Sequence, residues 1–176
     1  MPDISVGTIL VVSGLFFFLK SMDTLLPTEL FAIDDDERLF ISPVISDWSL
    51  IHDRGIEVII DLEGDLDQGV STRPGHMLYI YHHIYDEDLP DVARMQALAL
   101  MAAHLIRNGQ KVLAHCSMGF NRSALLAGLI LTELGVDGPA AVERLRARRP
   151  GALFNERFAA YLASLPARLT GAGFTG

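Results

Sequence analysis

The sequence contains a single cysteine, Cys116, which five residues separate from Arg122. Both border apolar runs, so the pattern predicts a strand, a loop that contains Gly119, and a buried helix. Such a loop gathers backbone N–H groups and the positive end of a helix dipole around one point, which can bind a tetrahedral oxyanion. A thiol there ionises readily, and an arginine can hold two oxygens of the same anion. We therefore expect a thiolate at Cys116 beside a bound oxyanion.

The candidate anion-binding residues form one continuous stretch: Ser117, Met118, Gly119, Phe120, Asn121 and Arg122. Glycine at position 119 permits the tight turn that such a loop needs. His115 precedes the cysteine and Ser123 follows the arginine. We interpret His115 as a residue that orders the loop by hydrogen bonding.

Length and composition limit what else the protein can be. The chain has 176 residues, 50% of them hydrophobic, and a formal net charge of −8. This length predicts one domain with a sizeable core. The acidic balance argues against a general nucleic-acid binder, because phosphate-backbone affinity needs a basic face. One cysteine excludes an intrachain disulfide framework and a multi-thiolate metal site.

Apolar patterning predicts strands that alternate with helices. The predicted strands are 38–41, 56–62, 77–84 and 111–115, and the predicted helices are 46–54, a helix opening within 86–91 and ending at 108, 123–134, 137–149 and 155–165. Alternation of this kind predicts an α/β fold in which helices flank a mostly parallel central sheet. The strand 56–62 is rich in β-branched residues, as expected of a strand buried on both faces.

The first 37 residues are interpreted as an apolar N-terminal extension followed by an acidic connection. Ile4 to Leu19 carries no charge, but as a helix it would span roughly 24 Å, less than the roughly 30 Å core of a bilayer. We therefore favour an added element that packs on the domain or on a second subunit, with a membrane anchor as the alternative. We expect a cytoplasmic protein with a domain at 38–165 and a C-terminal tail at 166–176.

The cysteine-x5-arginine spacing, with histidine before and serine after, resembles the signature of protein tyrosine phosphatases. Weaker matches follow in the family's order, and with them the chain resembles the dual-specificity, or atypical dual-specificity, branch over about residues 38–165. These matches are Leu39–Ser42, Val58–Leu62, Arg149–Leu153, Asn155 and Phe158. The resemblance implies a dual-specificity phosphatase-like fold with its phosphate-binding loop between a strand and a buried helix.

The resemblance also implies a mechanism. Cys116 would attack phosphorus to form a cysteinyl-phosphate, while Arg122 and the loop N–H groups hold the phosphoryl oxygens. An upstream aspartate would protonate the leaving oxygen, and Asp86 occupies the family's position for this acid, with Asp88 as its rival. Ser123 would donate a hydrogen bond to the sulfur and help it leave in the second step.

The expected substrate is a phosphorylated protein or a small phosphomonoester. The loop interior contains no Lys or Arg, which lowers the weight of phosphoinositides without removing them. We expect no cofactor, no metal, no nucleic-acid partner and no favoured membrane association, and the sequence leaves the oligomeric state open. Arg144, Arg146, Arg148 and Arg149 are interpreted mainly as a solvated helix face, with contact to substrate as the alternative.

Two other functions use the same residues. A module that recognises phosphorylated partners without turnover would keep the anion loop, although intact Cys116, Arg122 and Asp86 argue against it. A rhodanese-like sulfurtransferase also places one cysteine on a phosphate-like loop. Its loop usually has four residues between the cysteine and the basic residue, and Asp86 would then have no role.

Overall fold

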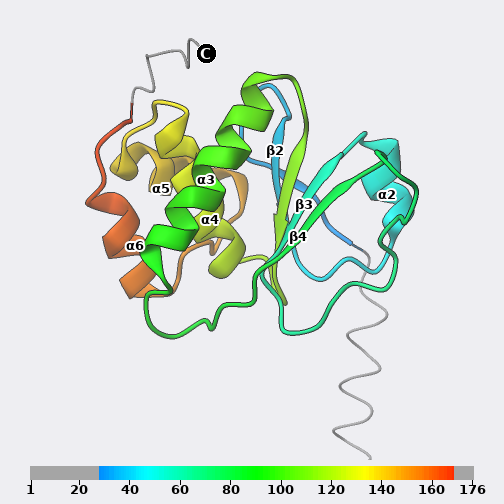
Figure 1. Cartoon of the computed structure of the whole chain (residues 1–176). Helices are drawn as coiled ribbons and strands as arrows, with labels where there is room; N and C mark the ends of the chain where they lie inside the picture. The colour runs from blue at the N-terminus through cyan, green and yellow to red at the C-terminus, as the bar shows by residue number, and fades with distance from the viewer. Residues whose placement is uncertain (1–27, 169–176) are drawn as a thin grey trace, which may run out of the picture.

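A five-stranded sheet forms the centre of the molecule (Figure 1). The computed structural model describes residues 28–168. The strands are β1 (Phe31–Ala32), β2 (Leu39–Ser42), β3 (Val58–Asp61), β4 (Leu78–Tyr81) and β5 (Val112–His115). Their order is β1-β2-β5-β3-β4, and every neighbouring pair is parallel except β1 with β2. The predicted mostly parallel α/β architecture is confirmed.

The helices lie on both sides of this sheet. They are α2 (Trp48–Asp53), α3 (Val92–Arg107), α4 (Arg122–Glu133), α5 (Gly138–Arg148) and α6 (Glu156–Ala163). Figure 1 shows α3 to α6 together on one side of the sheet and α2 on the other.

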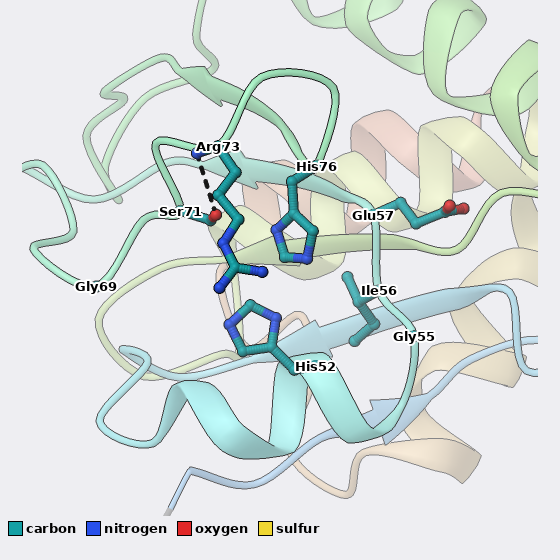
Figure 2. Close-up of a pocket in the computed structure, with 8 residues that line it drawn as sticks. All are labelled: His52, Gly55, Ile56, Glu57, Gly69, Ser71, Arg73 and His76. Atoms are coloured by element: carbon teal, nitrogen blue, oxygen red, sulfur yellow. Dashed lines mark hydrogen bonds between the residues drawn. The ribbon is translucent and has the colours of Figure 1, made fainter.

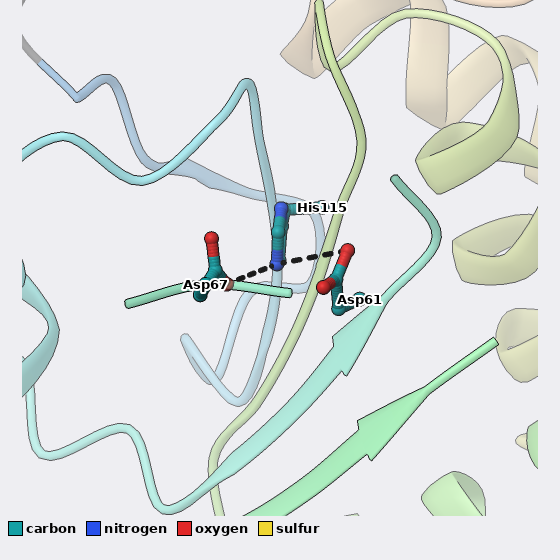
Figure 3. A group of neighbouring side chains, drawn as sticks. All are labelled: Asp61, Asp67 and His115. Carbon is teal, nitrogen blue, oxygen red and sulfur yellow. Dashed lines mark ion pairs between the residues drawn. The ribbon is translucent and has the colours of Figure 1, made fainter. Parts of the chain in front are cut away.

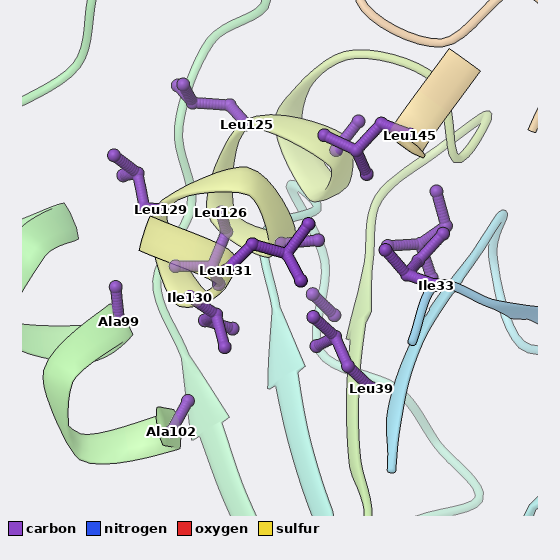
Figure 4. Close-up of a cluster of buried hydrophobic side chains, with 14 of the residues drawn as sticks. Ile33, Leu39, Ala99, Ala102, Leu125, Leu126, Leu129, Ile130, Leu131 and Leu145 are labelled. Atoms are coloured by element: carbon purple, nitrogen blue, oxygen red, sulfur yellow. The ribbon is translucent and has the colours of Figure 1, made fainter. Parts of the chain in front are cut away.

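Residues in the strands alternate between two hydrophobic clusters, because successive side chains of a strand point to opposite faces. In β3, Val58 and Ile60 join the cluster under α3 to α6, whereas Ile59 joins the cluster under α2. In β5, Leu113 likewise packs on the α2 side. Figure 4 shows part of the larger cluster. Both faces of the central strands are therefore covered, as a parallel sheet requires.

Helix α4 occupies the middle of the larger layer, and each of its 12 residues is buried. A Cβ atom on Gly128 would lie 2.1 Å from Leu162 Cδ2, so glycine lets α6 approach α4 closely. This packing fixes the N-terminal end of α4, where Arg122 is the first helical residue.

Two boundaries differ from the sequence prediction. Strand β1 lies within the stretch interpreted as an acidic connection, and two residues are too few to give a periodic signal. Helix α3 begins at Val92, because the Asp91 side chain caps it by accepting a hydrogen bond from Arg94 N–H at 3.1 Å. Residues 86–91 are consequently an irregular segment.

Most of the predicted N-terminal extension, including Ile4 to Leu19, and residues 169–176 of the predicted tail lie outside the described residues. Within 28–168, no helix has the length and apolar character to cross a membrane. The domain boundaries at 38 and 165 stay predictions.

Candidate active site

The loop from Cys116 to Asn121, here called the cysteine loop, joins the end of β5 to the start of α4. Gly119 lies at its bend with a φ of +69°, a conformation that side chains disfavour. A Cβ atom there would also lie 2.7 Å from the backbone of Ser42 and Pro43. The loop therefore turns tightly against the segment that follows β2, and only glycine fits at the turn.

The carbonyl and N–H groups of the cysteine loop differ in their hydrogen bonding. Four of its six carbonyl groups accept hydrogen bonds from outside the loop: Ser117 O from Val44 N (3.3 Å), Met118 O from Arg149 Nη2 (3.4 Å), Phe120 O from Leu153 N (2.8 Å) and Asn121 O from Leu125 N (2.7 Å). The N–H groups of residues 117–121 donate to no other group of the described chain. A loop with engaged carbonyls and free amides, ahead of a helix N-terminus, is suited to bind an anion.

Cys116 lies at the base of this loop and is 2% exposed. Its Sγ atom is 3.5 Å from the hydroxyl oxygen of Ser123, a fully buried residue in the first turn of α4. The sulfur thus has a hydroxyl partner and the positive end of the α4 dipole close by. The structure brings these two predicted site residues together.

The Arg122 side chain is held at the carboxyl ends of two strands. Its Nη1 donates to the carbonyl of Leu62, after β3, at 3.2 Å and to that of Ile84, after β4, at 3.3 Å. Its Nε atom is buried without a hydrogen-bond partner among the described residues. The guanidinium is therefore oriented by the sheet and keeps one N–H free for an oxyanion.

Glu63, which the sequence analysis did not single out, contacts both Ser117 and Arg122. Its Oε2 accepts hydrogen bonds from Ser117 Oγ at 2.5 Å and from Arg122 Nη2 at 3.2 Å. Burial opposes ionisation of this carboxyl, but the hydrogen bonds from Ser117 and Gly64 and the charge of Arg122 outweigh it and lower the pKa of Glu63. A carboxylate thus orients the outer nitrogen of the arginine.

Asp86 is connected to the cysteine loop by amide side chains. Asn121 Nδ2 donates to its Oδ2 at 2.9 Å, and Asn155 Nδ2 donates to its Oδ1 at 3.1 Å. Each amide is oriented by backbone N–H groups, since Asn121 Oδ1 accepts from Asn155 N and Asn155 Oδ1 accepts from the first turn of α6. Two oriented donors therefore fix the Asp86 carboxyl next to the loop.

Asp88 has a different environment. Both aspartates are exposed, but the Asp88 side chain forms an ion pair with Arg157. No contact connects it to the cysteine loop within residues 28–168. Of the two candidate acids, only Asp86 contacts the site.

Aromatic and basic side chains pack along the outer side of the loop. The guanidinium of Arg149 lies 4.0 Å from the ring centroids of both Phe31 and Phe120, a cation–π arrangement. Phe120 also neighbours Phe154, with 6.1 Å between ring centroids. Arg149 thus supports the loop, whereas Met118 is 64% exposed beside it. The interpretation of the late arginines as a solvated face does not describe Arg149.

His115 lies behind the loop and is fully buried. Its Nε2 atom is 2.8 Å from Asp67 Oδ2 and 3.6 Å from Asp61 Oδ1, as Figure 3 shows. Tyr79 donates its hydroxyl to Asp61 Oδ2 at 2.5 Å. His115 therefore belongs to a buried polar group that borders the site and that sequence spacing did not predict.

A separate hollow of about 520 Å³ lies at the opposite edge of the sheet. Residues that precede β3 and β4, among them Gly55 and His76, line this hollow. Figure 2 shows the side chains of Arg73, His52 and His76 gathered at the hollow, and the centroids of the two histidine rings are 5.4 Å apart. None of these residues belongs to the predicted site.

Solved structures share this arrangement of strands and helices. A mouse putative dual specificity phosphatase complexed with zinc tungstate aligns with a TM-score of 0.65 and 21% identity, over 78% of this chain and 86% of that chain. The chain has the dual-specificity phosphatase fold. No protein-family model matches the sequence, and neither does a curated protein.

Two more solved structures share the fold. Kinase associated phosphatase, solved with its catalytic site cysteine substituted by serine, aligns with a TM-score of 0.62 and 20% identity, over 78% of this chain and 93% of that chain. A human tyrosine phosphatase-like serine/threonine/tyrosine-interacting protein aligns with a TM-score of 0.62 and 21% identity, over 76% of this chain and 92% of that chain.

Proposed function

We propose that this protein is a cysteine-dependent phosphomonoester hydrolase that acts through a cysteinyl-phosphate intermediate. The observation that carries the proposal is the cysteine loop, in which four carbonyls accept hydrogen bonds from outside the loop while the N–H groups of residues 117–121 stay free beside Cys116. Preorganised donors of this kind stabilise the charge that develops on a transferring phosphoryl group. The fold, which phosphatases share, supports the same function.

In the first step, the Cys116 thiolate attacks phosphorus and forms the S–P bond while the bond to the leaving oxygen breaks. Loop N–H groups and the free Nε–H of Arg122 hold the non-bridging oxygens. The leaving oxygen receives a proton from Asp86 and departs as an alcohol or phenol.

In the second step, water attacks the phosphorus of the intermediate, and the S–P bond breaks. Asp86, now ionised, takes the proton of the water, and inorganic phosphate is released. The Ser123 hydroxyl, 3.5 Å from Sγ, donates a hydrogen bond to the thiolate that forms. The sulfur then returns to its ionised state.

The contacts of the two aspartates favour Asp86 as the acid. Asn121, a loop residue, holds Asp86 against the anion site, whereas Asp88 pairs with Arg157 on the surface. A general acid must reach the atom that it protonates, so the residue tied to the loop is the better candidate.

The substrate that we propose is a phosphorylated protein or a small phosphomonoester. The loop offers backbone N–H groups and one guanidinium, which suit a single phosphate. Residues 117–121 contain no Lys or Arg to pair with further phosphates. We also propose that the protein is cytoplasmic.

Hydrolysis of p-nitrophenyl phosphate by the wild type, Cys116→Ser, Asp86→Ala and Asp88→Ala tests the proposal. We expect turnover by the wild type without added metal and only the uncatalysed rate for Cys116→Ser. Cys116→Ser should still bind tungstate, because the loop amides and Arg122 remain. Turnover by Cys116→Ser at the wild-type rate would overturn the proposed function.

The aspartate pair forms a matched control. With an alkyl phosphate, whose leaving group needs a proton, kcat of Asp86→Ala should fall about 10²- to 10⁴-fold. Asp88→Ala should stay near the wild-type rate. A reversed order would assign the acid to Asp88 and leave the nucleophile unaffected.

A binding module without turnover is the second candidate. Both Asp86 oxygens already accept amide hydrogen bonds, and one fold neighbour is named an interacting protein. In this case the wild type would bind a phosphotyrosine peptide and hydrolyse neither the peptide nor p-nitrophenyl phosphate.

A further inference from the structure

A buried polar cluster lies behind the cysteine loop, where three parallel strands meet a loop. Asp61 ends β3, His115 ends β5, Tyr79 lies in β4, and Asp67 belongs to the loop between β3 and β4. The side chains of Asp61 and His115 are fully buried, and that of Asp67 is 8% exposed. Figure 3 shows both carboxylates directed at one nitrogen of the imidazole.

The charges of this cluster do not balance. Two carboxylates face one imidazole, and no Lys or Arg side chain contacts either carboxylate within residues 28–168. A buried carboxylate without a cationic partner is costly, and a bound cation would remove that cost.

The imidazole nitrogen also lacks an aligned hydrogen bond. Nε2 of His115 is buried and has no hydrogen-bond partner among the described residues, although Asp67 Oδ2 is 2.8 Å away. The oxygens therefore flank the nitrogen and do not lie along its N–H direction. This is the arrangement of ligand atoms around a shared centre.

We propose that Asp61, Asp67 and His115 form a binding site for a divalent cation of the zinc type. Zinc bonds to nitrogen and oxygen of about 2.0–2.2 Å place tetrahedral ligand atoms roughly 3.4 Å apart. The distances from Nε2 to the two carboxylate oxygens, 2.8 and 3.6 Å, lie on either side of that spacing. An imidazole with carboxylates is a ligand set that zinc accepts, and the phenol of Tyr79 then acts as a hydrogen-bond donor to the ligand Asp61.

The cation would have a structural effect on the neighbouring site. It would connect the loop that carries Asp67 to the ends of β3 and β5. Glu63, two residues after Asp61, contacts Ser117 and Arg122. The carboxyl end of β3 therefore carries both a proposed metal ligand and a residue that contacts the candidate active site. Asp67, the only partly exposed ligand, gives the ion its route from solvent. This inference does not depend on phosphatase activity.

Calorimetric titration of the full chain with ZnCl₂ at pH 7 tests the site. The background is Cys116→Ser, which removes the thiol as a competing ligand. We expect one Zn²⁺ per chain, and affinity reduced at least about tenfold by Asp67→Asn. Asp65→Asn is the matched control, because Asp65 is an exposed acid of the same loop outside the cluster. It should bind zinc as the background does.

A second readout uses Co²⁺ in place of Zn²⁺. The wild type should show the visible absorption of a tetrahedral nitrogen and oxygen site without the charge-transfer band of a thiolate ligand. Absence of binding in the Cys116→Ser background, or equal binding by Asp67→Asn, would overturn the proposal. If Asp67→Asn does not fold, the Co²⁺ spectrum decides, because a thiolate band would place the ion on Cys116.

Discussion

An arginine lies at each end of the parallel strands, Arg122 at the carboxyl edge of the sheet and Arg73 at the amino edge, but the two differ in how they are held. At the carboxyl edge, Arg122 is held by strand carbonyls and faces a loop whose amides are free. At the amino edge, Arg73 and His52 line an open hollow, and both are exposed. Within residues 28–168, neither the Arg73 guanidinium nor the His52 ring forms a hydrogen bond; Arg73 takes part through its backbone N, which donates to Ser71 Oγ at 3.4 Å (Figure 2). Both edges of the sheet therefore carry the positive charge of an arginine, but only the arginine at the carboxyl edge is held in one orientation by hydrogen bonds.

This difference bears on function, because donors stabilise a transition state only when they are already oriented toward it. The hydrogen bonds that hold the side chains of Arg122 and Asp86 supply this orientation. The residues of the hollow would need to be ordered by a ligand, at a cost in side-chain entropy. Substitutions matched between the two edges can test the contrast.

The largest difference in kcat/KM is expected between the variants Gly119→Ala and Gly55→Ala. Both glycines have positive φ, +69° and +64°, so each alanine costs about 1–2 kcal/mol of stability. At Gly119 the new Cβ would also meet backbone atoms at 2.7 Å, whereas at Gly55 nothing lies within 4 Å. We expect kcat/KM to fall about 10²- to 10³-fold for Gly119→Ala, as on loss of an oxyanion donor, and to change little for Gly55→Ala.

Steady-state kinetics with p-nitrophenyl phosphate and thermal melts of both variants provide the measurement. Equal losses of activity at the two positions would mean that general destabilisation, and not loop geometry, controls the rate.

The continuity of a site in sequence decided how well it could be predicted. Cys116, Arg122 and the loop between them are neighbours in the chain, so spacing alone placed them around one point. The β-branched run at 56–62 and the apolar run at 111–115 likewise predicted strands of a parallel sheet, and β3 and β5 lie within them.

Residues that meet only through the fold gave no such signal. Glu63 contacts Arg122 across 59 positions, and Asn155 contacts Asp86 across 69. The resemblance included Asn155 but gave it no role. Strand β1 was missed because antiparallel pairing with β2, and not its own two residues, defines it. The roles of the site residues stay predictions until they are measured.

A smaller effect is expected from Asn155→Asp, which separates positioning from stability. Aspartate keeps the oxygen that caps α6, so stability should change by less than about 0.5 kcal/mol. It replaces the amide donor to Asp86 with a second carboxylate. We expect kcat for an alkyl phosphate to fall by up to about 10²-fold, with a smaller loss for p-nitrophenyl phosphate, whose leaving group needs less help.

The pH dependence of kcat distinguishes a role of Asn155 in positioning Asp86 from a purely structural role, which would leave the profile unchanged. A carboxylate beside Asp86 favours its protonated form, so the basic limb of the kcat profile should move to higher pH. Asp137→Asn, a cap exchange on α5 away from the site, is the control. An unchanged profile for Asn155→Asp would remove Asn155 from the positioning of the acid.

The smallest effect is expected near the amino edge, at the cap of α2, the helix that carries His52. The Ser49 hydroxyl and N–H both donate to Asp47, at 2.6 and 2.9 Å, and these hydrogen bonds, the hydroxyl first, lower the pKa of Asp47 below its usual 3.8. A carboxyl whose pKa is lower in the folded state stabilises the fold above the unfolded pKa, and this contribution declines as pH falls through the folded pKa. Ser49→Ala should raise the pKa of Asp47 in an NMR titration and flatten the loss of stability below pH 3.8. Because Asp47 is fully exposed, phosphatase activity at neutral pH should be unchanged, and a loss of activity would show that the amino edge influences the site after all.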